Sequence, residues 1–156
     1  MLGPHAAPAD GEEDLVFTGA LLDALEASYC VDTERIFATG HSWGGDMAAV
    51  VACFLGERIT AAAPVAANRP YWFEPQTGEF SCEGEAAVWT FFGVADDHFT
   101  WQAYPGEFGD EQDAFWQEAH GCASEGATAL DYGLPASGHQ TPSYFSEAAM
   151  AWFTGF

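Results

Sequence analysis

The feature that most constrains the fold of this chain is a Gly-x-Ser-x-Gly pentapeptide at residues 40–44. An apolar stretch, 35–39, precedes it, and a helical pattern, 44–55, follows it. Between a strand and a helix, such a pentapeptide forms a nucleophile elbow, a turn that lifts the serine hydroxyl to the carboxyl end of the strand. We therefore expect the turn to require glycine at Gly40 and Gly44, because it leaves no room there for side chains.

The pentapeptide alone is weak evidence, because it arises by chance in roughly one of a dozen chains of this composition. Its context is more informative. Strand and helix patterns alternate along the chain, which predicts an α/β fold with a mainly parallel sheet flanked by helices. An amphipathic helix opens the series, and Ser143 is the candidate N-cap of the last helix. The predicted helices are 12–29, 44–55, 111–121 and 143–153, and the predicted strands are 35–39, 59–65, 86–93 and 127–132.

The length of the chain predicts a single domain. It has 156 residues, of which 49% are hydrophobic, enough for one globular core. Residues 1–11 are rich in Pro, Ala and Gly and are expected to form a loop or arm, so that 12–156 form the domain. No apolar run approaches the ~20 residues of a membrane span.

The charge of the chain limits its partners. It carries 24 acidic residues against 3 basic ones, a formal net charge of -21. Such a chain repels nucleic acids and anionic membranes. A solvated acidic surface is typical of secreted proteins or of proteins from salty habitats, and no calcium-binding loop pattern is present in the sequence.

The four cysteines are scattered without a Cys-x-x-Cys pair, which argues against a zinc site. Their even number fits two disulfides in an exported protein. We expect the cysteines to pair within each half of the chain, Cys30 with Cys53 and Cys82 with Cys122. The alternative is that all four are free, buried thiols.

Three residues with complementary chemistry follow predicted strands. Ser42, Asp96 and His139 come in the order of the α/β-hydrolase triad. A serine hydroxyl needs a base such as imidazole to remove its proton, and a carboxylate orients that imidazole. Asp97 is the alternative acid, and in that case Asp96 would cap a helix. His98 is the rival base, but it follows the acids too closely to reach back to the serine.

The segment 29–45 resembles the polyhydroxybutyrate depolymerase and feruloyl esterase family, secreted α/β-hydrolases of the LpqC-like esterase type. The similarity continues through 61–66, 92–96 and 138–142, and so covers most of the chain from Glu12 onward. The elbow segment is its most specific part.

The resemblance implies a role for each candidate residue. Ser42 matches the nucleophile, Asp96 the acid and His139 the base, and the Trp43 backbone N–H matches the first oxyanion donor. It implies no cofactor and no metal, an ester as substrate, and an extracellular or periplasmic location. Three positions depart from the family pattern without removing a triad member, namely Phe92 for histidine, Trp43 for asparagine and Asp97 for proline.

Members of that family carry several strands ahead of the helix expected at 12–29. A loop after one of these strands donates the second oxyanion N–H. We therefore expect a fragment that is incomplete at its N-terminus, with a wrongly started reading frame or a half supplied in trans as alternatives. The elbow strand is then an exposed apolar edge.

The expected activity is that of a serine ester hydrolase acting through an acyl-enzyme, either a polyhydroxybutyrate depolymerase or a feruloyl or acetyl-type esterase. The alternatives are a non-catalytic fragment or pseudoenzyme of the family and, less favoured, a serine peptidase of the same fold. Aromatic residues at 71–73, with Trp101 and Tyr104, either line a pocket for an aryl or polymeric ester or belong to the core.

Overall fold

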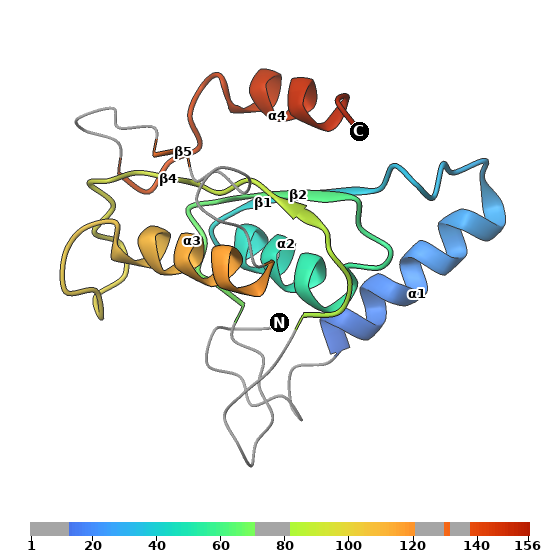
Figure 1. The fold of residues 1–156 in the computed structure, drawn as a ribbon, viewed down its shortest axis with the longest axis horizontal. Helices are drawn as coiled ribbons and strands as arrows, with labels where there is room; N and C mark the ends of the chain where they lie inside the picture. Colours follow the sequence, from blue (N-terminus) through green and yellow to red (C-terminus); the bar gives the residue numbers. More distant parts are fainter. Residues whose placement is uncertain (1–12, 71–81, 121–129, 132–137) are drawn as a thin grey trace, which may run out of the picture.

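A computed structural model describes residues 13–70, 82–120, 130–131 and 138–156 of the chain. The predicted arm at 1–11 and the aromatic residues at 71–73 lie outside the described residues. Helices and strands are interspersed along the described chain (Figure 1). The helices are α1 (Glu13–Ser28), α2 (Trp43–Phe54), α3 (Glu107–Ala119) and α4 (Phe145–Phe153), and the strands are β1 (Phe37–His41), β2 (Ala61–Val65), β3 (Ala87–Val88), β4 (Phe91–Phe92) and β5 (Leu130–Asp131).

The sheet is parallel in every pairing that the described strands make, with the order β1-β2-β4-β5 and with β3 also on β2. Helix α4 covers one face, and α1, α2 and α3 lie on the other (Figure 1). Strand β2 is buried along its whole length, whereas β1 ends the strand order and is partly exposed. The predicted parallel α/β architecture is therefore confirmed, with the elbow strand at an edge of the described sheet.

The strand predicted at 86–93 is divided into β3 and β4, although both pair with β2 in one continuous register. Proline explains the gap. The Ala66 N–H donates to the Phe91 carbonyl, so the equivalent donor two residues earlier is Pro64. Because proline has no N–H, the ladder loses a bond between the two short strands.

A disulfide joins Cys53, near the end of α2, to Cys82, which precedes β3. The predicted pairing of Cys53 with Cys30 is therefore wrong, and Cys30 is free and exposed. The cause is tertiary: the chain runs past the end of α2 before it enters β3, and the Glu83 N–H donates to the Cys53 carbonyl. Cys122, the other predicted partner of Cys82, lies outside the described residues.

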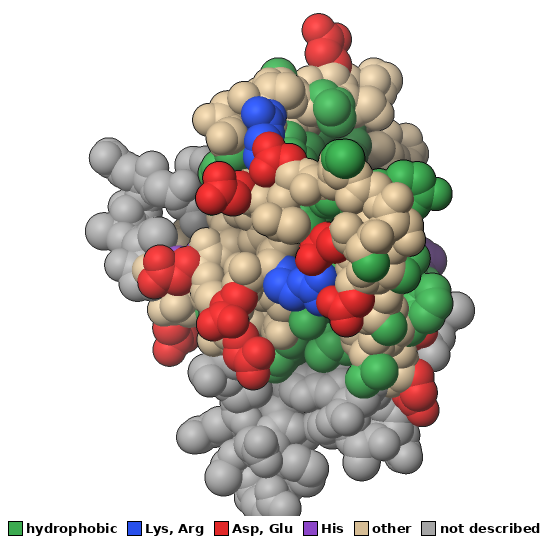
Figure 2. Space-filling model, turned by 90° about the vertical axis from the view of Figure 1, so that its right-hand side faces the viewer, with side chains coloured by type: hydrophobic (Ala, Val, Ile, Leu, Met, Phe, Trp, Pro, Cys, Tyr) green, Lys and Arg blue, Asp and Glu red, His purple; other side chains and the backbone are tan. Residues whose placement is uncertain are grey.

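Helix α1 is less amphipathic in its packing than its sequence predicts. Leu15 and Leu22 pack against the core between α2 and the sheet, but α1 contributes no fully buried residue. Arg58 also holds the helix through ion pairs of 2.8 Å to Asp23 and 2.7 Å to Glu26. On the face of the molecule that carries α1, hydrophobic side chains are exposed among charged groups that are mostly acidic (Figure 2). The exposed large hydrophobic residues of α1 are Val16, Phe17, Leu21 and Leu25.

Helix α3 begins four residues before the predicted start at 111. Glu107 lies in its first turn, where the helix dipole favours an acid. Its carboxylate accepts the Ala103 N–H, which ties the preceding loop to the helix. Gly106, with φ of 82°, turns the chain into the helix in a conformation that favours glycine.

Helix α4 begins at Phe145, and Tyr144 occupies its N-cap position without a capping side-chain hydrogen bond. The prediction that Ser143 caps the helix is therefore wrong. A turn takes over that role, because the Phe145 N–H donates to the Pro142 carbonyl. No helix in the described part of the chain is long and apolar enough to cross a membrane.

Candidate active site

Ser42 lies in the turn between β1 and α2 with φ of 56°. A positive φ is rare for a residue with a side chain, and it is the strained geometry of a nucleophile elbow. The Ser42 N–H donates to the Val65 carbonyl at 2.9 Å, which fixes the turn to the end of β2. The elbow predicted from the sequence is therefore present.

Two glycines make the turn possible, and one of them is not the residue expected. A Cβ on Gly40 would lie 2.2 Å from the Gly44 carbonyl oxygen, so Gly40 must lack a side chain, as predicted. A Cβ on Gly44 would meet nothing within 4 Å, so that part of the prediction is wrong. Gly45 is the second constrained position, because its Cβ would lie 2.7 Å from both Val65 O and the Ala67 Cβ.

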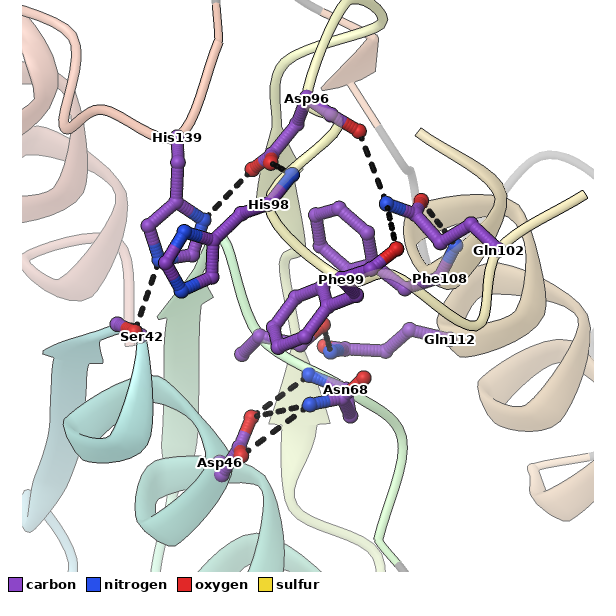
Figure 3. Close-up of polar contacts among 11 residues, drawn as sticks. Ser42, Asp46, Asn68, Asp96, His98, Phe99, Gln102, Phe108, Gln112 and His139 are labelled. Atoms are coloured by element: carbon purple, nitrogen blue, oxygen red, sulfur yellow. Dashed lines mark hydrogen bonds and ion pairs between the residues drawn. The ribbon is translucent and has the colours of Figure 1, made fainter. Parts of the chain in front are cut away.

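The three candidate residues form a continuous chain of hydrogen bonds (Figure 3). Nε2 of His139 lies 2.8 Å from Ser42 Oγ, and Nδ1 lies 2.8 Å from Asp96 Oδ2. Because a carboxylate only accepts, Nδ1 carries a proton and donates it, and Nε2 is left to accept from the serine hydroxyl. The imidazole is thus oriented to receive a proton from Ser42.

Asp96 is anchored from several directions. It is wholly buried, and its second oxygen, Oδ1, accepts the His98 N–H at 3.0 Å. Its backbone carbonyl accepts the Gly106 N–H at 2.8 Å and Nε2 of Gln102 at 3.1 Å. Asp97 is exposed. Of the two acids that the sequence left open, the structure brings Asp96 to the histidine.

Aromatic rings surround His139. The His98 ring lies parallel to it, with centroids 4.1 Å apart and planes 11° apart. Phe99 meets it edge-on at 5.6 Å, and the His41 ring lies at 4.9 Å. The pattern of strand ends does not predict these contacts, because they depend on how the loop after β4 folds back over the elbow.

His41 has a lowered pKa. Burial is the main cause, and the neighbouring His139 adds to it, while Asp96 and a hydrogen bond with the His139 backbone act in the opposite direction. The environment therefore favours the neutral form of His41 beside the base.

A buried polar group lies one turn behind the serine. The Asp46 carboxylate in α2 accepts the Asn68 backbone N–H at 2.7 Å and the Asn68 side-chain amide at 3.2 and 3.3 Å. Burial raises the pKa of Asp46, and the bonds from Asn68 oppose that rise. Gln112 of α3 donates to the Ala67 carbonyl at 2.6 Å. Together these bonds fix the segment after β2 against α2 and α3 (Figure 3).

Trp43 is the first residue of α2, and its side chain is 53% exposed. The N–H groups in the first turn of a helix have no partner within the helix and point outward at its positive end. The Trp43 backbone N–H is one of these first-turn groups and directly follows Ser42 in the chain.

Parts of the chain are similar in sequence to known esterases. No protein-family model matches the chain. A probable feruloyl esterase C of Aspergillus clavatus is 42% identical over 52 residues, which is 33% of this chain and 19% of the relative. Feruloyl esterase B of Piromyces equi is 40% identical over 65 residues, which is 42% of this chain and 12% of the relative.

Solved structures match over almost the whole chain. A Bacillus cereus carboxylesterase has a TM-score of 0.65 at 21% identity, covering 92% of this chain and 62% of its own. A thermostable esterase has a TM-score of 0.63 at 18% identity, covering 94% of this chain and 37% of its own. This chain therefore corresponds to only part of the proteins that it matches.

The parallel sheet and these structural likenesses show that the chain has the α/β-hydrolase fold, as the sequence predicts. Over part of its length, the chain is similar in sequence to feruloyl esterases.

Proposed function

We propose that the protein is a serine ester hydrolase that acts through an acyl-enzyme. The observation that carries this proposal is the hydrogen-bonded chain from Ser42 through His139 to the buried Asp96, built on a strained elbow. The names of the relatives, feruloyl esterases and carboxylesterases, support the same chemistry.

The reaction begins when Nε2 of His139 removes the Ser42 proton and Oγ attacks the ester carbonyl. Asp96 keeps Nδ1 protonated and stabilises the imidazolium that forms. The Trp43 N–H donates to the oxyanion of the tetrahedral intermediate. His139 then protonates the leaving alkoxide, and the acyl group remains on Ser42.

In the second half of the reaction, His139 removes a proton from water, and the resulting hydroxide attacks the acyl carbonyl. Return of that proton to Ser42 releases the acid and restores the enzyme. The atoms of one water molecule are divided between the two products, and the steps require no redox partner.

The proposed substrate is an aryl or polymeric ester of the feruloyl, acetyl or polyhydroxybutyrate type. Exposed aromatic side chains support this class, since Trp43, Trp101 and Tyr104 are about half exposed. Trp101 also contacts Phe99, at 5.6 Å, and Phe99 in turn contacts His139. An apolar rim of this kind fits an aromatic or methyl-rich ester better than a charged one.

The proposed location is an oxidising compartment, extracellular or periplasmic. The Cys53–Cys82 disulfide supports this location, because reducing compartments keep cysteine thiols reduced and disulfides persist in oxidising ones.

Hydrolysis of p-nitrophenyl acetate and butyrate by the chain tests the proposal. We expect turnover that is lost in Ser42→Ala, with the matching p-nitroanilide cleaved at least about a hundredfold more slowly. Turnover that survives in Ser42→Ala contradicts the proposal. A folded wild-type chain without turnover also contradicts it and favours a non-catalytic relative. Preference for the anilide favours a peptidase.

A further inference from the structure

We propose that His98 is a positioning residue, whose ring lies against the His139 imidazole and holds it in the plane that joins Ser42 to Asp96. This inference rests on the role of His139 as the base proposed above. It adds a residue outside the predicted triad to the machinery that keeps the base aligned.

His98 contacts both the Asp96 carboxylate and the His139 ring. Its backbone N–H donates to Asp96 Oδ1, while Oδ2 of the same carboxylate binds His139. Its ring stacks on His139 at 4.1 Å (Figure 3). One residue therefore fixes the hydrogen-bond partner of the base and also covers the face of the base.

The two hydrogen bonds of His139 leave one motion unrestrained. The imidazole can tilt about the axis through its two bonded nitrogens with little change in either bond length. A parallel ring blocks that tilt by direct contact. Among the ring contacts of His139 in the described residues, Phe99 is perpendicular at 90° and His41 is inclined at 54°, so the nearly parallel one is His98.

Because His98 is exposed, its effect on the base can be measured separately from any contribution to core packing. The side chain lies at the surface, so its removal leaves no cavity in the core. The parallel face also suits the imidazolium that forms during the reaction, because an aromatic face attracts a cation. Both effects require a flat ring, and neither requires the nitrogens of His98.

The test compares His98→Leu, which removes the ring, with His98→Phe, which keeps a flat one. With p-nitrophenyl acetate, we expect kcat of His98→Leu to fall by about ten- to a hundredfold, the loss typical of a small misplacement of a reacting group. KM should stay within about twofold, and His98→Phe should recover most of kcat. Thermal midpoints of both variants should match that of the wild type.

A second readout does not depend on turnover. The His139 Nδ1 proton, bonded to Asp96, is followed by NMR in histidine-labelled protein. We expect its exchange with water to be at least about tenfold faster in His98→Leu and unchanged in His98→Phe. Wild-type kcat together with slow exchange in His98→Leu overturns the inference, as does an equal loss in both variants. A folded wild-type chain without turnover contradicts the proposed function, while the exchange rates still decide the role of His98.

Discussion

The Asp96 carboxylate lies 2.8 Å from Nδ1 of His139 and is wholly buried, whereas Asp97, its neighbour in the chain, is exposed. Two adjacent acids at one strand end thus occupy opposite environments. Only the buried one can hold the imidazole in a fixed tautomer without competition from water.

Asp96→Asn should lower kcat for p-nitrophenyl acetate by about 10³–10⁴, because an amide can donate to Nδ1 and so favour the wrong tautomer. Asp97→Asn is the matched control, since it makes the same chemical change one residue away, and its kcat should stay within about twofold. Equal losses in the two variants would contradict the assignment of Asp96 as the acid.

The glycines of the elbow give a matched pair for stability. Gly45→Ala should destabilise the protein by about 1–3 kcal/mol, because its Cβ would meet Val65 O and the Ala67 Cβ at 2.7 Å. Gly44→Ala should be neutral or stabilising by up to about 1 kcal/mol, since alanine favours the helix and its Cβ meets nothing. Urea unfolding measures both; the reverse order of stability would show that the elbow packs differently.

Local signals in the sequence predict the elbow and the strand ends well. Gly40 and Ser42 lie between an apolar run and a helical pattern, and that pattern alone determines that the serine stands at a strand end. Asp96 follows β4 and His139 follows β5, and in a parallel sheet the carboxyl ends of the strands share one edge. Short-range pattern and sheet topology therefore predict the serine, the histidine and a pair of candidate acids, and the burial of Asp96 decides between the two acids.

What the sequence could not predict depends on long-range packing. The pairing of Cys53 with Cys82 depends on the path of the chain beneath α2, and the need for glycine at 45 depends on contact with Ala67. The stacking of His98 on His139 likewise depends on how one loop folds over another. No local pattern encodes these contacts.

The buried Asp46 makes a pH-dependent contribution to stability. Its pKa is raised above the ordinary 3.8, mainly by burial. The folded state therefore holds this proton more tightly than the unfolded chain does. The Asp46 contribution to the free energy of unfolding must then rise as the pH falls into the window just above 3.8, and must fall as the pH rises through the folded pKa.

Asp46→Asn isolates this contribution, because every other carboxylate titrates in both proteins. The free energy of unfolding of the wild type minus that of Asp46→Asn should be larger at about pH 4.5 than at about pH 7. Urea unfolding at both pH values measures it. A difference that is constant, or larger at pH 7, would show that burial does not penalise the Asp46 charge.

The disulfide should contribute substantially to stability. It closes a loop with a sequence separation of 29, for which the chain-entropy relation gives about 3–4 kcal/mol. Cys53→Ala/Cys82→Ala should lose about that much in urea unfolding. Cys30→Ala, at a free and exposed cysteine, is the control and should change stability by less than about 0.5 kcal/mol. Equal effects would argue against the Cys53–Cys82 pairing.

Labelling with a fluorophosphonate tests the central claim most directly, because the reagent reacts with a serine whose hydroxyl is activated by a neighbouring base. The adduct is mapped by mass spectrometry in the folded 156-residue chain. We predict a single adduct on Ser42, absent in Ser42→Ala and formed at least about tenfold more slowly in Asp96→Asn. A folded chain that remains unlabelled at Ser42, or that labels equally in Ser42→Ala, would contradict the account.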